Sequence, residues 1–177
     1  MFIYDKKLQY PVKIANPNPR LASVIISQYG GPDGELGASL RYLSQRYSMP
    51  YDELKGLLTD IGTEELGHLE MIGAIIHQLT RNLKDSQIQD SAFAPYFVDH
   101  TAGVYPTAAS GFPWSAASMA VKGDPIADLT EDLAADATTL QSQLLKIPVN
   151  FNRNFLRFWI TTIDYNVINQ DINDLAS

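Results

Sequence analysis

The chain has 177 residues, 45% of them hydrophobic and 19% charged, with 20 acidic against 13 basic side chains and a net charge of −7. It contains no cysteine, which excludes disulfides, thiolate zinc sites, iron–sulfur clusters and cysteine nucleophiles. The acidic surface would repel phosphates, which argues against nucleic-acid binding. No apolar run approaches the length of a membrane span, and the N-terminus lacks the pattern of a classical signal peptide. We therefore expect a soluble protein inside the cell.

The first half of the chain predicts an arm followed by two helices. Residues 1–19 end in a proline-rich stretch, which excludes a long helix and indicates an extended arm. Apolar residues at steps of three and four then predict a helix over about 20–47, with a kink or break at residues 30–34, where glycines and a proline interrupt the pattern. The same periodicity predicts a second helix over about 51–82.

The second half predicts a crossover and two further helices. Residues 84–124 carry several prolines and glycines and indicate a long irregular crossover with room for one short helix. Helices are predicted over about 125–146 and 150–173. Two helices, a long crossover and two more helices are typical of an all-α, ferritin-like four-helix bundle, here one domain over 1–177. The apolar face of the third helix is expected to comprise Ile126, Leu129, Leu133, Ala137, Leu140 and Leu144.

Polar residues interrupt the apolar faces of the first two helices. Glu35 lies on the inward face of the first helix, and Glu65 and His68 occupy inward positions of the second, where leucines would be expected. Glu65 and His68 form a Glu-x-x-His pair, and a carboxylate and an imidazole at that spacing can bind one metal ion and share a bridge to a second. The neighbouring Glu64 and Glu70 fall off this face and are expected to be solvated.

The remaining candidate ligands are few, because the chain has only three histidines. His77 comes nine residues after His68 and is expected on the opposite side of the helix, and His100 lies in the crossover. Asp136 comes seven residues after Leu129, so it is an inward-facing candidate ligand on the third helix. A Glu-x-x-His pair alone occurs by chance in many helices, so a helix that binds no metal is the alternative. The carboxylates on other helices favour the metal site.

Several segments of the sequence strongly resemble the manganese catalase family, and within it the spore-coat CotJC branch. The resemblance is nearly continuous from residue 4 to about residue 136 and weakens beyond. The segments that carry it are Tyr4–Val12, Gln28–Leu36, Ala38–Tyr47, Leu58–Met71 and Lys122–Leu129.

The resemblance implies a bundle that holds two manganese ions and disproportionates hydrogen peroxide. The implied metal ligands include Glu35, Glu65 and His68, with Glu65 as the bridge between the ions. Tyr42 matches a tyrosine that hydrogen-bonds the first glutamate, so Tyr42 and Glu65 are the expected catalytic residues. Oxygen and nitrogen ligands suit manganese and do not exclude iron. The family also implies a homo-oligomer, commonly a hexamer. The proline-rich arm and the long crossover themselves suggest that these segments wrap a neighbouring subunit.

Two helices depart from the family pattern. Asp136 stands where the family has a glutamate and is one methylene shorter, and Ile163 and Asn166 stand where the fourth helix carries another Glu-x-x-His. One interpretation is a manganese-catalase-like protein with weak or lost activity, binding two ions if the site is intact and one or none if it is degraded. The alternative is a structural protein of the spore coat or another assembly, with other coat proteins as partners. The expected location is the cytoplasm or the spore coat.

Overall fold

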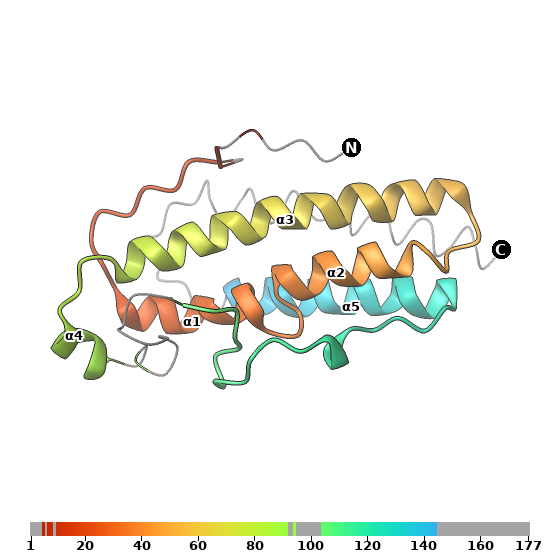
Figure 1. Cartoon of the computed structure of the whole chain (residues 1–177). Coiled ribbons are helices and arrows are strands. Elements are labelled where there is room, and N and C mark those ends of the chain that lie inside the picture. The colour runs from red at the N-terminus through yellow and green to blue at the C-terminus, as the bar shows by residue number, and fades with distance from the viewer. Residues whose placement is uncertain (1–4, 6, 9, 92–93, 95–103, 145–177) are drawn as a thin grey trace.

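The computed structural model describes residues 5, 7–8, 10–91, 94 and 104–144, with the side chains of 136–144 excepted. Apart from isolated bridges at Val104 and between Thr107 and Pro113, the regular structure in these residues is helical. No helix among them is both long and apolar enough to cross a membrane. The elements are α1 Pro19–Gly30, α2 Glu35–Gln45, α3 Asp52–Thr80, α4 Asp85–Gln89, the 3-10 turn η3 Ala116–Ser118, and α5 Pro125–Leu144. Figure 1 shows α3 running the length of the molecule beside α1 and α2, which follow one another.

The first predicted helix is broken into α1 and α2. The break falls at residues 31–34, where the glycines and the proline interrupted the helical pattern, so that part of the prediction is confirmed. A Cβ atom on Gly34 would lie 2.5 Å from the carbonyl oxygen of Ser27, so the chain needs glycine to pass this close to α1. The break makes Glu35 the first residue of α2.

The other helices predicted within the described residues agree with the structure within a few residues. The helix expected over 51–82 is α3, and the helix expected over 125–146 is α5, which begins at Pro125. The carboxylate of Asp124 caps α5 by accepting a hydrogen bond of 2.9 Å from the amide of Ala127. The crossover contains α4 and η3, and the helix predicted over 150–173 lies outside the described residues.

The extended arm is fastened to the end of α3 by side chains that bond its backbone. The amide of Gln78 donates to the carbonyl of Val12 at 2.9 Å and accepts from the amide of Ile14 at 2.8 Å. The guanidinium of Arg81 donates to the carbonyl of Ile14 at 2.6 Å. Val12 and Ile14 thereby pack against the apolar residues of α1 and α3.

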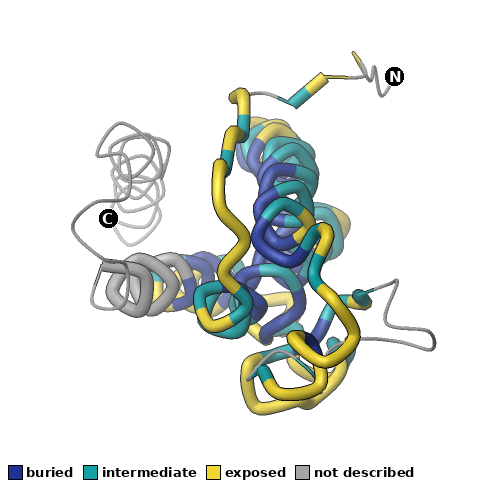
Figure 2. Tube along the Cα trace, turned by 90° about the vertical axis from the view of Figure 1, so that its left-hand side faces the viewer, coloured by how far each residue is buried: buried dark blue, intermediate teal, exposed yellow. Residues whose placement is uncertain are grey.

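Two apolar clusters form the described core, one toward each end of α3. Figure 2 shows the buried residues where the long helices face one another. Glu65 and His68 fall between Ile61 of one cluster and Ile72 of the other, so the polar positions are enclosed on both sides. The first cluster comprises Ala22, Ile26, Ile72, Ile75, Ile76 and Leu79. The second comprises Ala38, Tyr42, Met49, Leu54, Leu58, Ile61 and Leu129.

The buried face of α5 differs from the prediction. Ile126 is 43% exposed, so its assignment to the apolar face is wrong; it lies in the first turn, which packs less fully than the turns that follow. Asp128 and Asp132 are buried instead. Asp128 accepts a hydrogen bond of 2.7 Å from the amide of Lys122, and Asp132 accepts one of 3.0 Å from the side chain of Gln45 on α2. Because these hydrogen bonds replace those with water, the two carboxylates can occupy the interior.

Candidate metal centre

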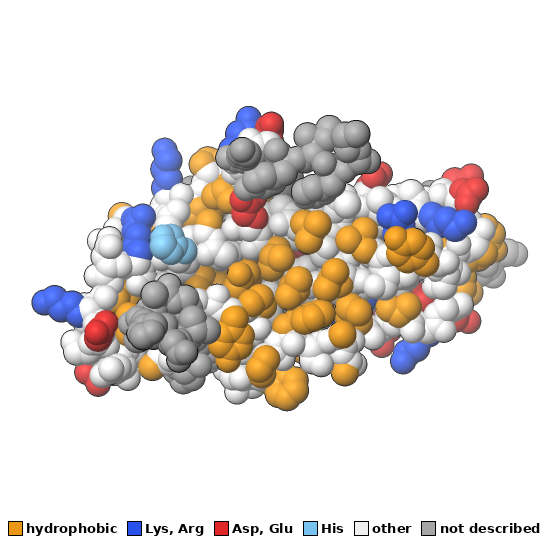
Figure 3. All heavy atoms as spheres, in the orientation of Figure 1, with side chains coloured by type: hydrophobic (Ala, Val, Ile, Leu, Met, Phe, Trp, Pro, Cys, Tyr) orange, Lys and Arg blue, Asp and Glu red, His pale blue; other side chains and the backbone are white. Residues whose placement is uncertain are grey.

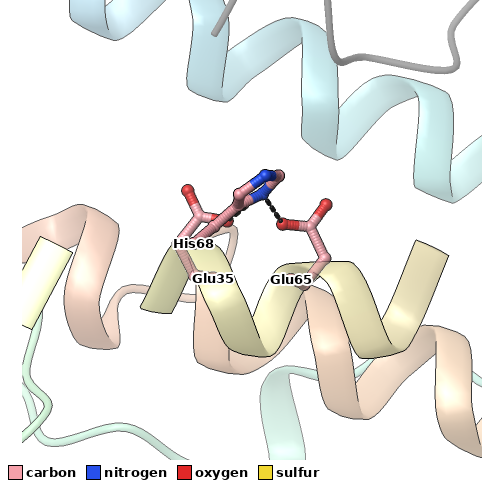
Figure 4. A group of neighbouring side chains, drawn as sticks. All are labelled: Glu35, Glu65 and His68. Carbon is pink, nitrogen blue, oxygen red and sulfur yellow. Dashed lines mark hydrogen bonds and ion pairs between the residues drawn. The ribbon is translucent and has the colours of Figure 1, made fainter. Parts of the chain in front are cut away.

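Three potential metal ligands meet where α2 packs against α3. Glu35 comes from the first turn of α2, and Glu65 and His68 come from successive turns of α3. Nδ1 of His68 lies 2.7 Å from Oε2 of Glu65 and 3.7 Å from Oε2 of Glu35. One ligand atom from each of the three residues lies within 4.8 Å of the others. Figure 4 shows the imidazole ring with a carboxylate on either side.

The three groups share protons, and burial and mutual charge set their pKa values. Burial and the negative charge of Glu65 raise the pKa of Glu35 well above its ordinary value, although His68 works in the opposite direction. Burial also opposes ionisation of Glu65, but hydrogen bonds with His68 and Glu35 outweigh it and lower the pKa of Glu65. Burial lowers the pKa of His68, but its hydrogen bonds to Glu35 and Glu65 prevail and raise that pKa to about 10. The arrangement therefore favours an anionic Glu65 beside a cationic His68.

The donor set has room for a cation. Oε1 of Glu35 is buried and accepts no hydrogen bond from the residues that the structure describes. A buried carboxylate oxygen without a donor is costly, and coordination of a cation would remove that cost. A cation would also relieve the repulsion between Glu35 and Glu65. Two carboxylates and an imidazole suit manganese or iron, so the residues present fit such a metal.

The other candidate residues from the sequence are Tyr42, His77, Asp136 and His100, and the structure describes only some of them. Tyr42 is on α2 and 1% exposed, within the apolar cluster formed with α3 and α5. His77 is exposed on the opposite side of α3, as its spacing from His68 predicted. Asp136 belongs to α5, but its side chain is among those that the structure does not describe, and His100 lies outside the described residues.

Two further polar side chains are not among the candidates from the sequence. Glu64, which was expected to be solvated, has a side chain that is 34% exposed, and its Oε1 lies 3.8 Å from Nε2 of His68. The spacing of Glu64 and His68 could have predicted this proximity, because residues four apart are neighbours on a helix. Arg41 is 3% exposed, and its guanidinium lies 3.4 Å from a carboxylate oxygen of Asp33, bracing the turn that precedes Glu35. Nothing in the local pattern indicated that this arginine would be buried.

A helical bundle with a carboxylate–histidine group between its helices is the arrangement seen in proteins that hold metal ions in a bundle core. The sequence profile of the family described as "Manganese containing catalase" matches residues 1–148. The chain belongs to this manganese catalase family.

Relatives by sequence include protein CotJC and several manganese catalases. Protein CotJC of Bacillus subtilis (strain 168) is 51% identical over 136 residues, which cover 77% of this chain and 71% of that protein. A probable manganese catalase of Clostridium acetobutylicum is 34% identical over 147 residues, covering 77% of this chain and 61% of that protein. A manganese catalase of Bacillus subtilis is 31% identical over 150 residues, covering 77% of this chain and 55% of that protein. The chain thus spans less than two thirds of the length of these two catalases.

Solved structures give the same family. Wild-type KatB, a manganese catalase from Anabaena, superposes with a TM-score of 0.85 at 28% sequence identity, over 99% of this chain and 81% of that one. This match confirms the predicted ferritin-like helical bundle as well as the family resemblance.

Proposed function

We propose that this chain is a manganese-catalase-like protein that binds manganese through Glu35, Glu65 and His68 and disproportionates hydrogen peroxide to water and dioxygen. The observation that carries the proposal is the meeting of these three side chains within 4.8 Å in the interior of a manganese catalase family member. Manganese, when bound, would supply the electron exchange with peroxide, which none of the side chains can perform.

The chain's own residues would bind the metal and handle protons. Glu65 is the proposed bridging ligand because its carboxylate lies beside His68 on its own helix and opposite Glu35 on the next. Tyr42 comes two turns after Glu35 on the same helix, and we propose that its hydroxyl orients that carboxylate. Asp136 is the proposed further ligand, since it comes one turn after the buried Asp132 on α5.

We expect the catalase activity to be weak and each chain to bind one or two ions. In the alignment that the family resemblance implies, Ile163 and Asn166 stand in place of the family's second Glu-x-x-His, so the chain would lack an imidazole ligand and an acid–base group there. Asp136 is one methylene shorter than the family's glutamate. Two ions would bind if Asp136 completes the site, and one ion if it does not. Iron is the alternative metal because the same donor set suits it.

A second candidate function is a structural role in a spore coat. The observation that favours it is the 51% identity to protein CotJC, compared with 31–36% to the catalases matched by sequence. Under this proposal the chain is a homo-oligomer, with a hexamer expected, located in the spore coat and in contact with other coat proteins. Figure 3 shows hydrophobic side chains gathered across the face formed by α2 and α3, which supports contact with another copy. Light scattering that gives a monomer at micromolar concentration would rule out the oligomer.

Metal analysis combined with oxygen evolution separates the two functions. The purified protein, reconstituted with Mn²⁺, is expected to retain one to two ions per chain and to release oxygen from peroxide slowly. Two ions with rapid turnover would overturn the proposal of a weakened site. A chain that retains no metal and evolves no oxygen would overturn the catalase proposal and leave the structural one.

A further inference from the structure

Ser39 of α2 makes a direct hydrogen bond to the backbone of α3. Its hydroxyl donates to the carbonyl oxygen of Gly62 at 2.6 Å, and the bond is buried. Ser39 is 0% exposed, so water cannot replace this contact. A buried hydrogen bond without competing water holds two groups at a defined separation.

The two helices approach closely at the same level because residue 62 has no side chain. A Cβ atom on Gly62 would lie 2.8 Å from Cγ of Leu43 and 3.1 Å from Cβ of Tyr42, both on α2. The first distance is shorter than real Cβ contacts and the second is tighter than most, so an alanine here would require Leu43 to move or the two helices to separate. The glycine permits the two helices to approach closely, and the hydrogen bond from Ser39 stabilises that approach.

This contact lies one helical turn from the candidate metal ligands on both helices. Ser39 follows Glu35 by four residues, and Gly62 precedes Glu65 by three. The distance between α2 and α3 at this contact, and the position of one helix along the axis of the other, therefore determine where the carboxylate of Glu35 lies relative to Glu65 and His68. We propose that Ser39, acting through the carbonyl of Gly62, is a positioning residue that determines the affinity of the site for manganese. This inference rests on the proposed metal site.

Ser44 offers a matched control on the same helix. Its hydroxyl also donates a hydrogen bond of 2.6 Å, but to the carbonyl of Leu40 within α2. Ser44→Ala removes a serine hydroxyl from the same helix without loosening α2 from α3, whereas Ser39→Ala removes the fastening between them. Ser39→Thr retains the hydroxyl and tests whether the hydroxyl, and not the identity of the residue, matters.

The experiment measures Mn²⁺ affinity by titration, together with the electron paramagnetic resonance spectrum of the bound ion, in the full-length variants at a temperature where all are folded. Ser39→Ala is expected to weaken Mn²⁺ binding by about tenfold or more, in the range typical of residues that support metal ligands, and to change the spectrum. Ser44→Ala is expected to stay within about twofold of the wild type, and Ser39→Thr to bind more tightly than Ser39→Ala.

Each other result contradicts a specific statement. Equal affinities for Ser39→Ala and the wild type would overturn the positioning role, and so would equal losses in Ser39→Ala and Ser44→Ala. A wild-type protein that binds no Mn²⁺ would overturn the proposed function itself, and the positioning role with it.

Discussion

Nδ1 of His68 donates a hydrogen bond of 2.7 Å to Oε2 of Glu65, one turn earlier on the same helix. Each partner favours the charged form of the other, which lowers the pKa of Glu65 and raises that of His68 to about 10. The two atoms that share this proton are also candidate metal ligands. Because a cationic imidazole must lose a proton before it can bind a metal ion, metal binding is expected to depend on pH.

Replacing His68 is expected to abolish tight manganese binding. His68→Ala removes the only nitrogen ligand of the group that the described residues form. His77→Ala is the matched control, because it removes an exposed histidine from the same helix. Metal content after gel filtration should fall well below the wild-type value in the first variant and remain unchanged in the second. Equal metal content in all three proteins would show that His68 is not a ligand.

Manganese affinity is expected to rise with pH between about 6 and 8. His68, whose pKa is raised to about 10, is protonated throughout this range and must lose its proton to bind a metal. Each displaced proton increases the apparent affinity by about tenfold per pH unit. Titration calorimetry in buffers of different ionisation enthalpy counts the protons released. An affinity that does not change with pH, with no proton release, would contradict the shared-proton arrangement.

The metal-free protein is expected to lose stability as the solution becomes alkaline. The folded-state pKa of His68, about 10, lies above its ordinary value of 6.5, so its stabilising contribution is complete below about pH 6.5 and is lost as pH rises through 10. Glu65, whose pKa is lowered, affects stability in acid. Its stabilising contribution is present above its ordinary value of 4.5 and is lost as the pH falls below that value. Thermal unfolding with a chelator should show a steeper alkaline decline in the wild type than in His68→Ala. Parallel curves would contradict this prediction.

Lengthening Asp136 is expected to strengthen metal binding. Asp136→Glu restores the methylene that the family's glutamate has, and Asp136→Asn removes the charge. The first variant should retain more manganese per chain than the wild type, and the second should retain less. Glu131→Gln, an exposed position on α5, serves as the control for a lost charge. If all three variants match the wild type in metal content, Asp136 is not a ligand.

Two glycine-to-alanine variants are expected to change stability in opposite directions. A Cβ on Gly30 would lie 2.1 Å from the amide nitrogen of Thr107, so Gly30→Ala forces the crossover away from α1 and should cost about 1–3 kcal/mol. A Cβ on Gly56 would meet nothing within 4 Å, and this residue lies within α3. Gly56→Ala should therefore stabilise the protein by about 0.5–1 kcal/mol through helix propensity. Chemical denaturation of the metal-free variants measures both values, and a stable Gly30→Ala would contradict the close contact.

The pairing of Glu65 with His68 was predictable from sequence because an α-helix places residues three apart on one face. The inward position of Glu35 followed from the same periodicity, as did the outward position of His77. Caps such as Asp124 were predictable as well, since they bond amides only three residues away. These features depend on interactions within a single helix or turn, which the local sequence specifies directly.

Contacts between helices were decided only by the tertiary structure. The burial of Asp128 and Asp132 depends on donors supplied by the crossover and by α2, and the exposure of Ile126 depends on how little covers the first turn of α5. The bond from Ser39 to Gly62 depends on the height at which α2 meets α3. Periodicity indicates which face of a helix is buried, but it contains neither the translation nor the crossing of two helices. The sequence by itself therefore determined the candidate ligands and the helical bundle, whereas the packing of α2 on α3 decided which of them meet.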